Sequence, residues 1–262
     1  GLGDNLGMCG IVGIWQLDGG NVDQEVLDRF TDSLAHRGPD GRGTIIDNEA
    51  GIGLGHRRLA ILDLRSSGQQ PMTYGNRRYW IVFNGEIYNF LELRAELEGL
   101  GHQFHTDSDT EVVLASYVQW GQDCQLKFNG MWAFAIWDNS DHTLFLSRDR
   151  FGVKPLFFLN ERSWFLFASE LKAFMSLPFS IRPQFNYQMI ARMKNEESID
   201  QTLLQNVINL NAGCCLTVKH KGVPKVRRWW RTADHLETAP LTFQEQVERY
   251  KELFFDACRI RM

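Results

Sequence analysis

Cys9 stands at the head of an apolar run and directly follows Met8. Loss of Met8 and everything before it would make Cys9 the first residue, with a free α-amine beside its thiol. An α-amine has an ordinary pKa near 8, close to the value of about 8.5 for a cysteine thiol. Such an amine can accept the thiol proton and so activate the sulfur as a nucleophile. A cysteine in a buried strand is more commonly just a small apolar side chain, so position alone does not decide between the two.

The dipeptide Asn84-Gly85 follows a strand-like segment and precedes Glu86. Asn-Gly is a strong signal for a tight hairpin turn. A side-chain amide and a backbone N–H at the end of a strand can also form an oxyanion hole, in which each donor stabilises a tetrahedral intermediate by about 3 kcal/mol. The two interpretations are compatible, and the dipeptide is a candidate for both.

Arg58 and Asp109 could hold the two charged ends of a free amino acid. Arg58 lies in a predicted strand, and an arginine that points inward offers a planar fork to a carboxylate. Asp109 lies in the first turn of a predicted helix, where the helix dipole alone is enough to favour an acidic residue. A bound amino acid nevertheless needs one cation and one anion, and these two residues could supply them.

The bulk composition excludes several classes of partner. With 262 residues, 44% of them hydrophobic and 23% charged, the sequence is typical of a globular protein. Its formal net charge is -4 and its arginines occur in pairs rather than runs, so we expect no nucleic-acid partner. The longest purely apolar stretch, Met131–Trp137, is far shorter than the roughly 20 residues of a membrane span. We expect no membrane partner.

The five cysteines indicate a reducing compartment. Their number is odd and no C-x-x-C pattern occurs, so we expect neither a disulfide framework nor a zinc site, and a cytoplasmic location fits best. The seven histidines show no spacing that predicts a metal site, and the sequence has no G-x-x-x-x-G-K-[ST] phosphate loop.

The candidate residues need a scaffold, and the hydrophobic pattern predicts many strands with helices outside them. Strands are predicted near residues 9–17, 43–46, 52–62, 79–83, 131–138, 143–147, 156–159 and 164–168. Helices are predicted to begin at Asn21, Asn89 and Ser108. Glu92 and Glu111 each stand three residues after such a cap and would complete capping boxes. Together these elements predict a layered α+β domain with covered sheets.

The sequence changes character after residue 180. Strand density falls over residues 176–183, where two prolines occur, so a connecting segment is predicted to begin there. Residues 207–230 predict a small β unit. Residues 243–262 predict a helix whose apolar residues recur at helical spacing and form a stripe.

Seven stretches, taken together and in order, resemble the glutamine-dependent asparagine synthetases. They are MCGIVGIW, HRGPDG, GHRRLAILD, FNGEIYN, SDTE, SRDRFGVKPLFF and FASELKAF. The resemblance is dense from Met8 to about residue 180 and weaker from Asn209 to Trp230. HRGPDG and RDRFGVKPL distinguish the asparagine synthetases best from other class II amidotransferases. Those relatives are similar at CGI and NGE but differ around HRG.

The resemblance implies a four-layer αββα fold of the N-terminal nucleophile hydrolases and hydrolysis of glutamine to glutamate and ammonia. By motif, Cys9 matches the nucleophile, and Asn84 and Gly85 match the oxyanion donors. Arg58 matches the residue that holds the α-carboxylate of glutamine, and Asp109 a residue that contacts its α-ammonium. The remaining pocket wall is matched by Leu59, Ile61, Leu62 and Glu86.

The resemblance also implies a division of the chain. Residues 1–8 are expected to be absent from the active form, and residues 9–180 to form the glutaminase domain. Residues 181–262 are expected to connect to, and begin, a synthetase domain whose SGGLDS motif the sequence does not contain. That domain would use ATP and Mg²⁺ to convert aspartate to asparagine, while no cofactor is expected in residues 1–262 themselves. The resemblance also allows for a homodimer.

Two alternatives stay open at this point. If residues 1–8 remain attached, the α-amine is blocked, and the domain could be a silent module that binds glutamine or packs against a partner. If the domain is active, its ammonia could also serve a different carboxylate acceptor, because acceptor recognition would lie in the following domain.

Overall fold

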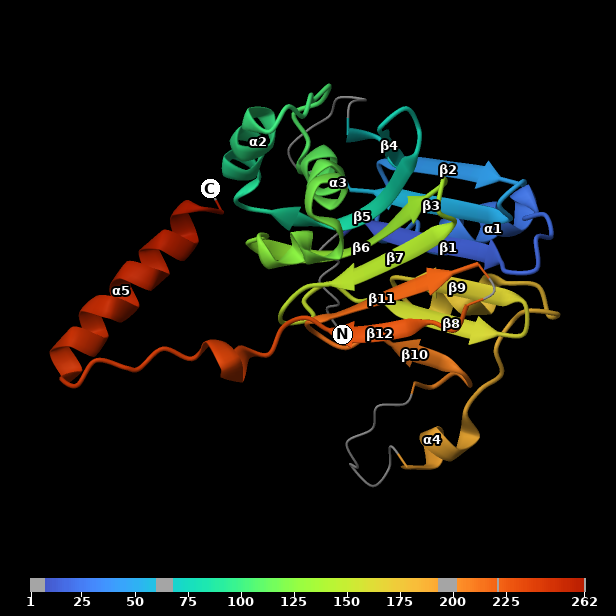
Figure 1. Cartoon of the computed structure of the whole chain (residues 1–262). Coiled ribbons are helices and arrows are strands. Elements are labelled where there is room, and N and C mark those ends of the chain that lie inside the picture. The colour runs from blue at the N-terminus through green and yellow to red at the C-terminus, as the bar shows by residue number, and fades with distance from the viewer. Residues whose placement is uncertain (1–7, 60–67, 193–201, 221, 262) are drawn as a thin grey trace.

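Two antiparallel sheets form the centre of the molecule in the computed structural model, which describes residues 8–59, 68–192, 202–220 and 222–261 (Figure 1). Within these residues each sheet has six strands. The first sheet has the order β10-β8-β9-β1-β3-β2, with bounds Val207–Asn209, Phe157–Glu161, Trp164–Ala168, Gly10–Gln16, Ile52–Arg58 and Gly41–Asp47. The second has the order β12-β11-β7-β6-β5-β4, with bounds Lys225–Arg228, Cys214–Lys219, Thr143–Arg148, Gly130–Asp138, Tyr79–Ile87 and Met72–Tyr74.

Helices cover the outer faces of both sheets, so the molecule has four layers. Helix α1, Gln24–Asp32, packs on the first sheet, and its Leu27 and Phe30 share a buried cluster with Val12 and Ile14 of β1. Helices α2, Phe90–Gly99, and α3, Asp109–Trp120, cover the second sheet through another buried cluster. A third cluster fills the space between the sheets. This αββα arrangement confirms the predicted fold.

Strand β6 shows how the sequence produces these layers. Its residues are buried almost without interruption, which is expected of a strand covered on both faces. Trp132 and Phe134 point toward α2 and α3, whereas Ala133 and Ala135 point toward the first sheet. Successive side chains of a strand point to opposite faces, so one apolar run supplies two cores at once.

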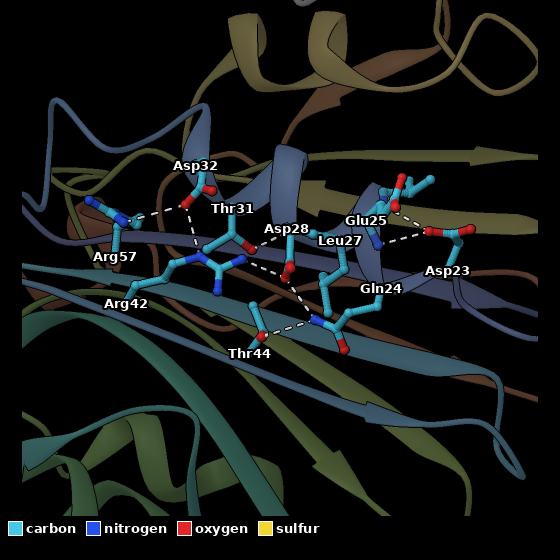
Figure 2. A network of polar contacts seen from close by, with 11 residues as sticks. Asp23, Gln24, Glu25, Leu27, Asp28, Thr31, Asp32, Arg42, Thr44 and Arg57 are labelled. Atoms are coloured by element: carbon cyan, nitrogen blue, oxygen red, sulfur yellow. Dashed lines mark hydrogen bonds and ion pairs between the residues drawn. The ribbon is translucent and has the colours of Figure 1, made fainter.

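Helix α1 begins two residues later than predicted. Its cap is Asp23, not Asn21, because the Asp23 carboxylate accepts hydrogen bonds from the Glu25 and Val26 amides at 2.8 and 3.1 Å (Figure 2). Figure 2 also shows Arg42 of β2 bridging Asp28 and Asp32 of the helix. The helix is thus tied to the edge of the first sheet by charged groups as well as by its apolar face.

The caps of α2 and α3 differ from the predicted capping boxes. Asn89 does precede α2, but its side chain binds Asn129 N and Lys127 O, both on the segment before β6, and does not cap the helix. Ser108 caps α3 by accepting from Thr110 N at 3.2 Å. The Glu111 carboxylate does not return to Ser108 because it accepts from the loop before the helix, at His105 N and Thr106 N.

The dipeptide Asn84-Gly85 is not a turn, which corrects the prediction. Strand β5 runs through it, and Asn84 pairs with Ala133 and Gly85 with Trp132 of β6. Gly85 is needed there because a Cβ at this position would lie 2.3 Å from Met131 O. The long β5–β6 ladder therefore places this dipeptide in a rigid sheet rather than in a loop.

The sheets also continue past residue 180, where the sequence placed the end of the domain. β10 pairs with β8 of the first sheet, and β11 pairs with β7 of the second. The strands predicted in residues 207–230 are present, but they extend both sheets and do not form a separate unit. Assignment of later residues to a following domain stays a prediction.

Further helices complete the described chain. Their bounds are η2 Gly121–Leu126, η3 Leu171–Ser176, α4 Tyr187–Arg192, η5 Thr232–His235 and α5 Phe243–Arg259. Helix α5 stands away from the sheets in Figure 1, and Thr242 and Glu245 form a capping box at its start. Among the described residues, none of the helices has the length and apolar character needed to cross a membrane.

Candidate active site

A cavity of about 340 Å³ lies where β1 begins and where β3 and β5 end. This volume lies in the range of small-molecule binding sites. The register of the first sheet explains part of the site, since Gly10 of β1 pairs with Arg57 of β3 and so sets Cys9 beside Arg58 and Leu59. Seven predicted site residues line the cavity, namely Cys9, Arg58, Leu59, Asn84, Gly85, Glu86 and Asp109. The other two, Ile61 and Leu62, lie outside the described residues.

Cys9 is held from both sides. The Leu59 amide donates to its Sγ at 3.5 Å, which attaches the thiol to the end of β3. The carbonyl oxygen of Cys9 accepts a hydrogen bond from Arg37 Nε at 3.0 Å, and Arg37 NH1 in turn donates to Glu170 Oε1 at 2.8 Å. The arginine of the HRGPDG motif therefore fixes the backbone of the candidate nucleophile.

The surroundings of the Cys9 thiol act on its pKa in opposite directions. Burial raises the pKa, while the Leu59 hydrogen bond and the positive charges of Lys154, Arg58 and Arg37 lower it. Burial dominates, so the pKa of the thiol lies above its ordinary value. The thiol therefore needs a base close by before it can act as a nucleophile at neutral pH.

Asn84 has an unused donor at the cavity. The residue is only 1% exposed, and its Nδ2 has no hydrogen-bond partner among the described residues. A buried donor without a partner costs about 1–3 kcal/mol, so such groups in folded proteins call for an explanation. Its place in the cavity wall beside Gly85 fits a donor that is satisfied only when a ligand is bound.

Asp109 and Arg58 give the cavity one anion and one cation. Asp109 Oδ2 accepts from Ile87 N at 3.0 Å, and burial raises the pKa of this carboxyl to about 6, so it is mostly ionised at neutral pH. The Arg58 guanidinium lies next to Gly68, where a Cβ would come within 2.9 Å of its NH2. The structure therefore brings Arg58 and Asp109 to one cavity, and their roles in binding an amino acid stay a prediction.

Gln70 and His56 belong to the cavity although the sequence did not single them out. Gln70 Oε1 accepts from Phe83 N at 2.6 Å and its Nε2 donates to Thr110 Oγ1 at 3.4 Å, so it joins β5 to α3. His56 Nε2 lies 3.2 Å from Phe83 O, and burial lowers its pKa to about 3, which keeps it neutral. The alternation of β3 could have revealed His56, because it shares a face with Arg58; nothing in the sequence marks Gln70.

Lys154 also lines the cavity, and the RDRFGVKPL motif explains how it reaches there. The motif begins at the end of β7, where the buried Asp149 carboxylate accepts hydrogen bonds from four backbone amides, those of Trp132, Phe151, Val153 and Lys154. The resemblance included this motif but gave Lys154 no role. Among the described residues, no group of three or more His, Cys, Asp or Glu side chains could hold a metal ion.

Comparisons with known proteins identify the family of the domain. The family model described as "Glutamine amidotransferase domain" matches residues 8–230. Asparagine synthetase [glutamine-hydrolyzing] 3 of Bacillus subtilis is 37% identical over 95% of this chain and 41% of its own length. The enzymes numbered 1 and 2 of the same organism are 45% and 34% identical, over 64% and 95% of this chain and 27% and 35% of their own lengths. The chain thus spans less than half the length of these relatives.

Solved structures agree on the fold. The glutamine phosphoribosylpyrophosphate amidotransferase of Bacillus subtilis, complexed with ADP and GMP, superimposes with a TM-score of 0.61 at 20% identity. The match covers 85% of this chain and 49% of that one, and at this identity it shows the fold alone. With a matching family model over most of its length and the same two-sheet architecture, the chain belongs to the family of glutamine amidotransferase domains.

Proposed function

We propose that this domain hydrolyses glutamine to glutamate and ammonia with Cys9 as the nucleophile. The observation that carries the proposal is the buried Asn84 Nδ2, which has no partner among the described residues and lines the same cavity as the Cys9 thiol. A donor of this kind is what a tetrahedral intermediate on the sulfur would require.

The chemistry follows from a chain that starts at Cys9. Its α-amine accepts the thiol proton, and the sulfur attacks the side-chain carbonyl carbon of glutamine. Asn84 Nδ2 and the Gly85 amide donate to the oxyanion. The intermediate then expels ammonia, to which the α-ammonium returns the proton, and leaves a thioester on Cys9. Water attacks this thioester with the amine again as base, and glutamate leaves.

Binding of the substrate is assigned to Arg58 and Asp109, two of the charged residues that line the cavity. Arg58 offers its guanidinium to the α-carboxylate of glutamine, and Asp109 offers its carboxylate to the α-ammonium. Leu59 and Glu86 form part of the wall between them. For Ile61 and Leu62 a place in this wall stays a prediction.

The wider reaction is proposed from the names of the relatives. Those of Bacillus subtilis are called glutamine-hydrolysing asparagine synthetases, so the ammonia made here would serve the ATP-dependent and Mg²⁺-dependent conversion of aspartate to asparagine in a following domain. A homodimer stays a prediction. A cytoplasmic location is supported by the five cysteines, which are all free thiols.

Replacement of Asn84 tests the oxyanion assignment. Asn84→Ala should lower kcat for glutamine hydrolysis by about 10²–10³ and change KM much less, because the lost hydrogen bond forms mainly in the transition state. Asn160→Ala, at an exposed position on β8, is the matched control and should behave like the parent protein. A rise in KM with unchanged kcat would show that Asn84 only binds substrate.

A further inference from the structure

Lys154 places a buried positive charge in the cavity wall. The side chain is only 7% exposed, although lysines are seldom buried unless they are paired. Within residues 8–59, 68–192, 202–220 and 222–261, its Nζ forms no ion pair, and its hydrogen bond goes to Met8 Sδ at 3.4 Å. A thioether is a weak acceptor. The ammonium is therefore directed at the residue that precedes Cys9, and among the described residues no carboxylate binds it directly.

The backbone of Lys154 is held by hydrogen bonds at both its amide and its carbonyl group. Lys154 N donates to Asp149 Oδ2 at 3.0 Å, and Lys154 O accepts from Arg148 Nε at 2.8 Å. The Arg148 guanidinium also donates to Gly152 O and to Leu210 O, so it joins this loop to the segment after β10. These bonds hold the backbone of Lys154 beside the cavity.

Charged groups of both signs face Lys154 and Cys9. Lys154 and Cys9 act on each other. Two further cations, Arg37 and Arg58, and two anions, Glu86 and Asp149, act on one or both of them. His56 is neutral, Glu170 pairs with Arg37, and Asp109 of α3 lines the same cavity. Burial and the charge of Arg37 lower the pKa of Lys154, while Cys9, Asp149 and Glu86 raise it.

A positive charge at this place has two electrostatic consequences. It stabilises a thiolate on Cys9, because opposite charges attract strongly where water is excluded. It also disfavours a second positive charge on an α-amine at the same residue. Both effects favour removal of a proton from Cys9, whose thiol and amine would titrate as a coupled pair.

We propose that Lys154 is a positioning residue that acts through Cys9: its buried ammonium favours the thiolate form of the nucleophile and disfavours protonation of the α-amine that loss of residues 1–8 would free. As long as residues 1–8 are attached, the Lys154 ammonium donates its hydrogen bond to Met8 Sδ. Once Met8 is removed, the ammonium can interact with the new N-terminus at Cys9. This assignment rests on the proposed function, because the α-amine exists only in a chain that starts at Cys9.

Alkylation of Cys9 tests the assignment without glutamine. The protein is the chain from Cys9 onward with Cys258→Ser, since Cys258 is the exposed cysteine and Cys124, Cys214 and Cys215 are buried. The rate of reaction with iodoacetamide is followed against pH. Lys154→Met should move the midpoint upward by about one pH unit, and Lys154→Arg should restore it. Lys225→Met, an exposed lysine on β12, should leave it unchanged.

The pH dependence of glutamine hydrolysis gives the second readout. In Lys154→Met the midpoint of the acid limb of kcat/KM should move to higher pH by about the same amount as the alkylation midpoint. A purely structural role would instead lower kcat/KM by the same factor at every pH. Unchanged midpoints in Lys154→Met, or no rescue by Lys154→Arg, would overturn the assignment. If the parent protein fails to hydrolyse glutamine, the proposed function fails, while the alkylation midpoints still decide the role of Lys154.

Discussion

At the residue scale, the candidate site joins groups from distant parts of the chain at one cavity. In the proposed function Cys9 is the nucleophile and Asn84 an oxyanion donor, while Arg58 and Asp109 would hold the two charged ends of an amino acid. The motifs predicted these residues because each type is demanded by the chemistry itself. Gln70 could not be predicted, since its value lies only in a hydrogen bond to Phe83 that the fold creates.

Asp109 makes stability depend on pH. Burial raises the pKa of its carboxyl to about 6 in the folded protein, above the unfolded value of about 3.9. The folded state therefore holds the proton more tightly, and this contribution to stability is present below pH 4 and is lost as the pH rises through 6. Asp109→Asn should increase the free energy of unfolding by up to about 3 kcal/mol at pH 7 and much less at pH 4.

Urea unfolding of Asp109→Asn and the parent at both pH values measures this difference. Asp18→Asn, at an exposed position, is the control and should change little at either pH. Asp109→Asn should also bind glutamine more weakly, because a neutral amide cannot form an ion pair with the α-ammonium. An equal effect at pH 4 and pH 7 would rule out the ionised carboxylate as the cause.

At the element scale, strands were easier to predict than the ends of helices. The apolar run of β6 predicted a strand covered on both faces because that pattern follows from packing alone. The caps of α1 and α2 depend on which groups compete for a side chain. Asn89 is engaged by Asn129, forty residues later, which no local pattern reveals. The turn predicted at Asn84-Gly85 was wrong for a related reason. Pairing with β6 keeps this dipeptide in a strand despite its local preference for a turn.

The loop between β7 and β8 depends on one carboxylate. Asp149 is 1% exposed and accepts from four backbone amides, two of them at Val153 and Lys154. Asp149→Ala should lower the free energy of unfolding by about 3 kcal/mol or more, because buried donors lose a charged acceptor. Chemical denaturation measures the loss, with the exposed Asp141→Ala as control. A loss below about 1 kcal/mol would show that the loop holds without Asp149.

At the scale of the whole molecule, the chain beyond residue 180 belongs partly to the two sheets. β10 and β11 each extend a sheet, although in the sequence they lie far from the strands they pair with. The hydrophobic pattern could find these strands but not their partners, because pairing between remote segments leaves no local signal. The apolar stripe predicted in α5 is present and largely exposed, with Phe243 at 80% and Tyr250 at 68%.

Truncation should separate these two parts. A chain that ends at residue 236 lacks only α5 and its approach, so its melting temperature should stay within a few degrees of the parent. A chain that ends at residue 180 loses strands from both sheets and exposes the edges of β8 and β7. Its melting temperature should fall by about 10 °C or more, or the protein should aggregate. Equal melting temperatures for both truncations would place the domain end at 180 after all.

Cys9 is proposed to work as an N-terminal nucleophile. The rate of glutamate release, measured for chains that differ in their first residue, tests this role most directly. Three proteins are compared: the chain from Cys9 onward, the same chain with Cys9→Ala, and the chain that starts at Gly1. We expect glutamate release from the first protein alone. Comparable release from a chain that mass spectrometry shows to start at Gly1 would contradict it.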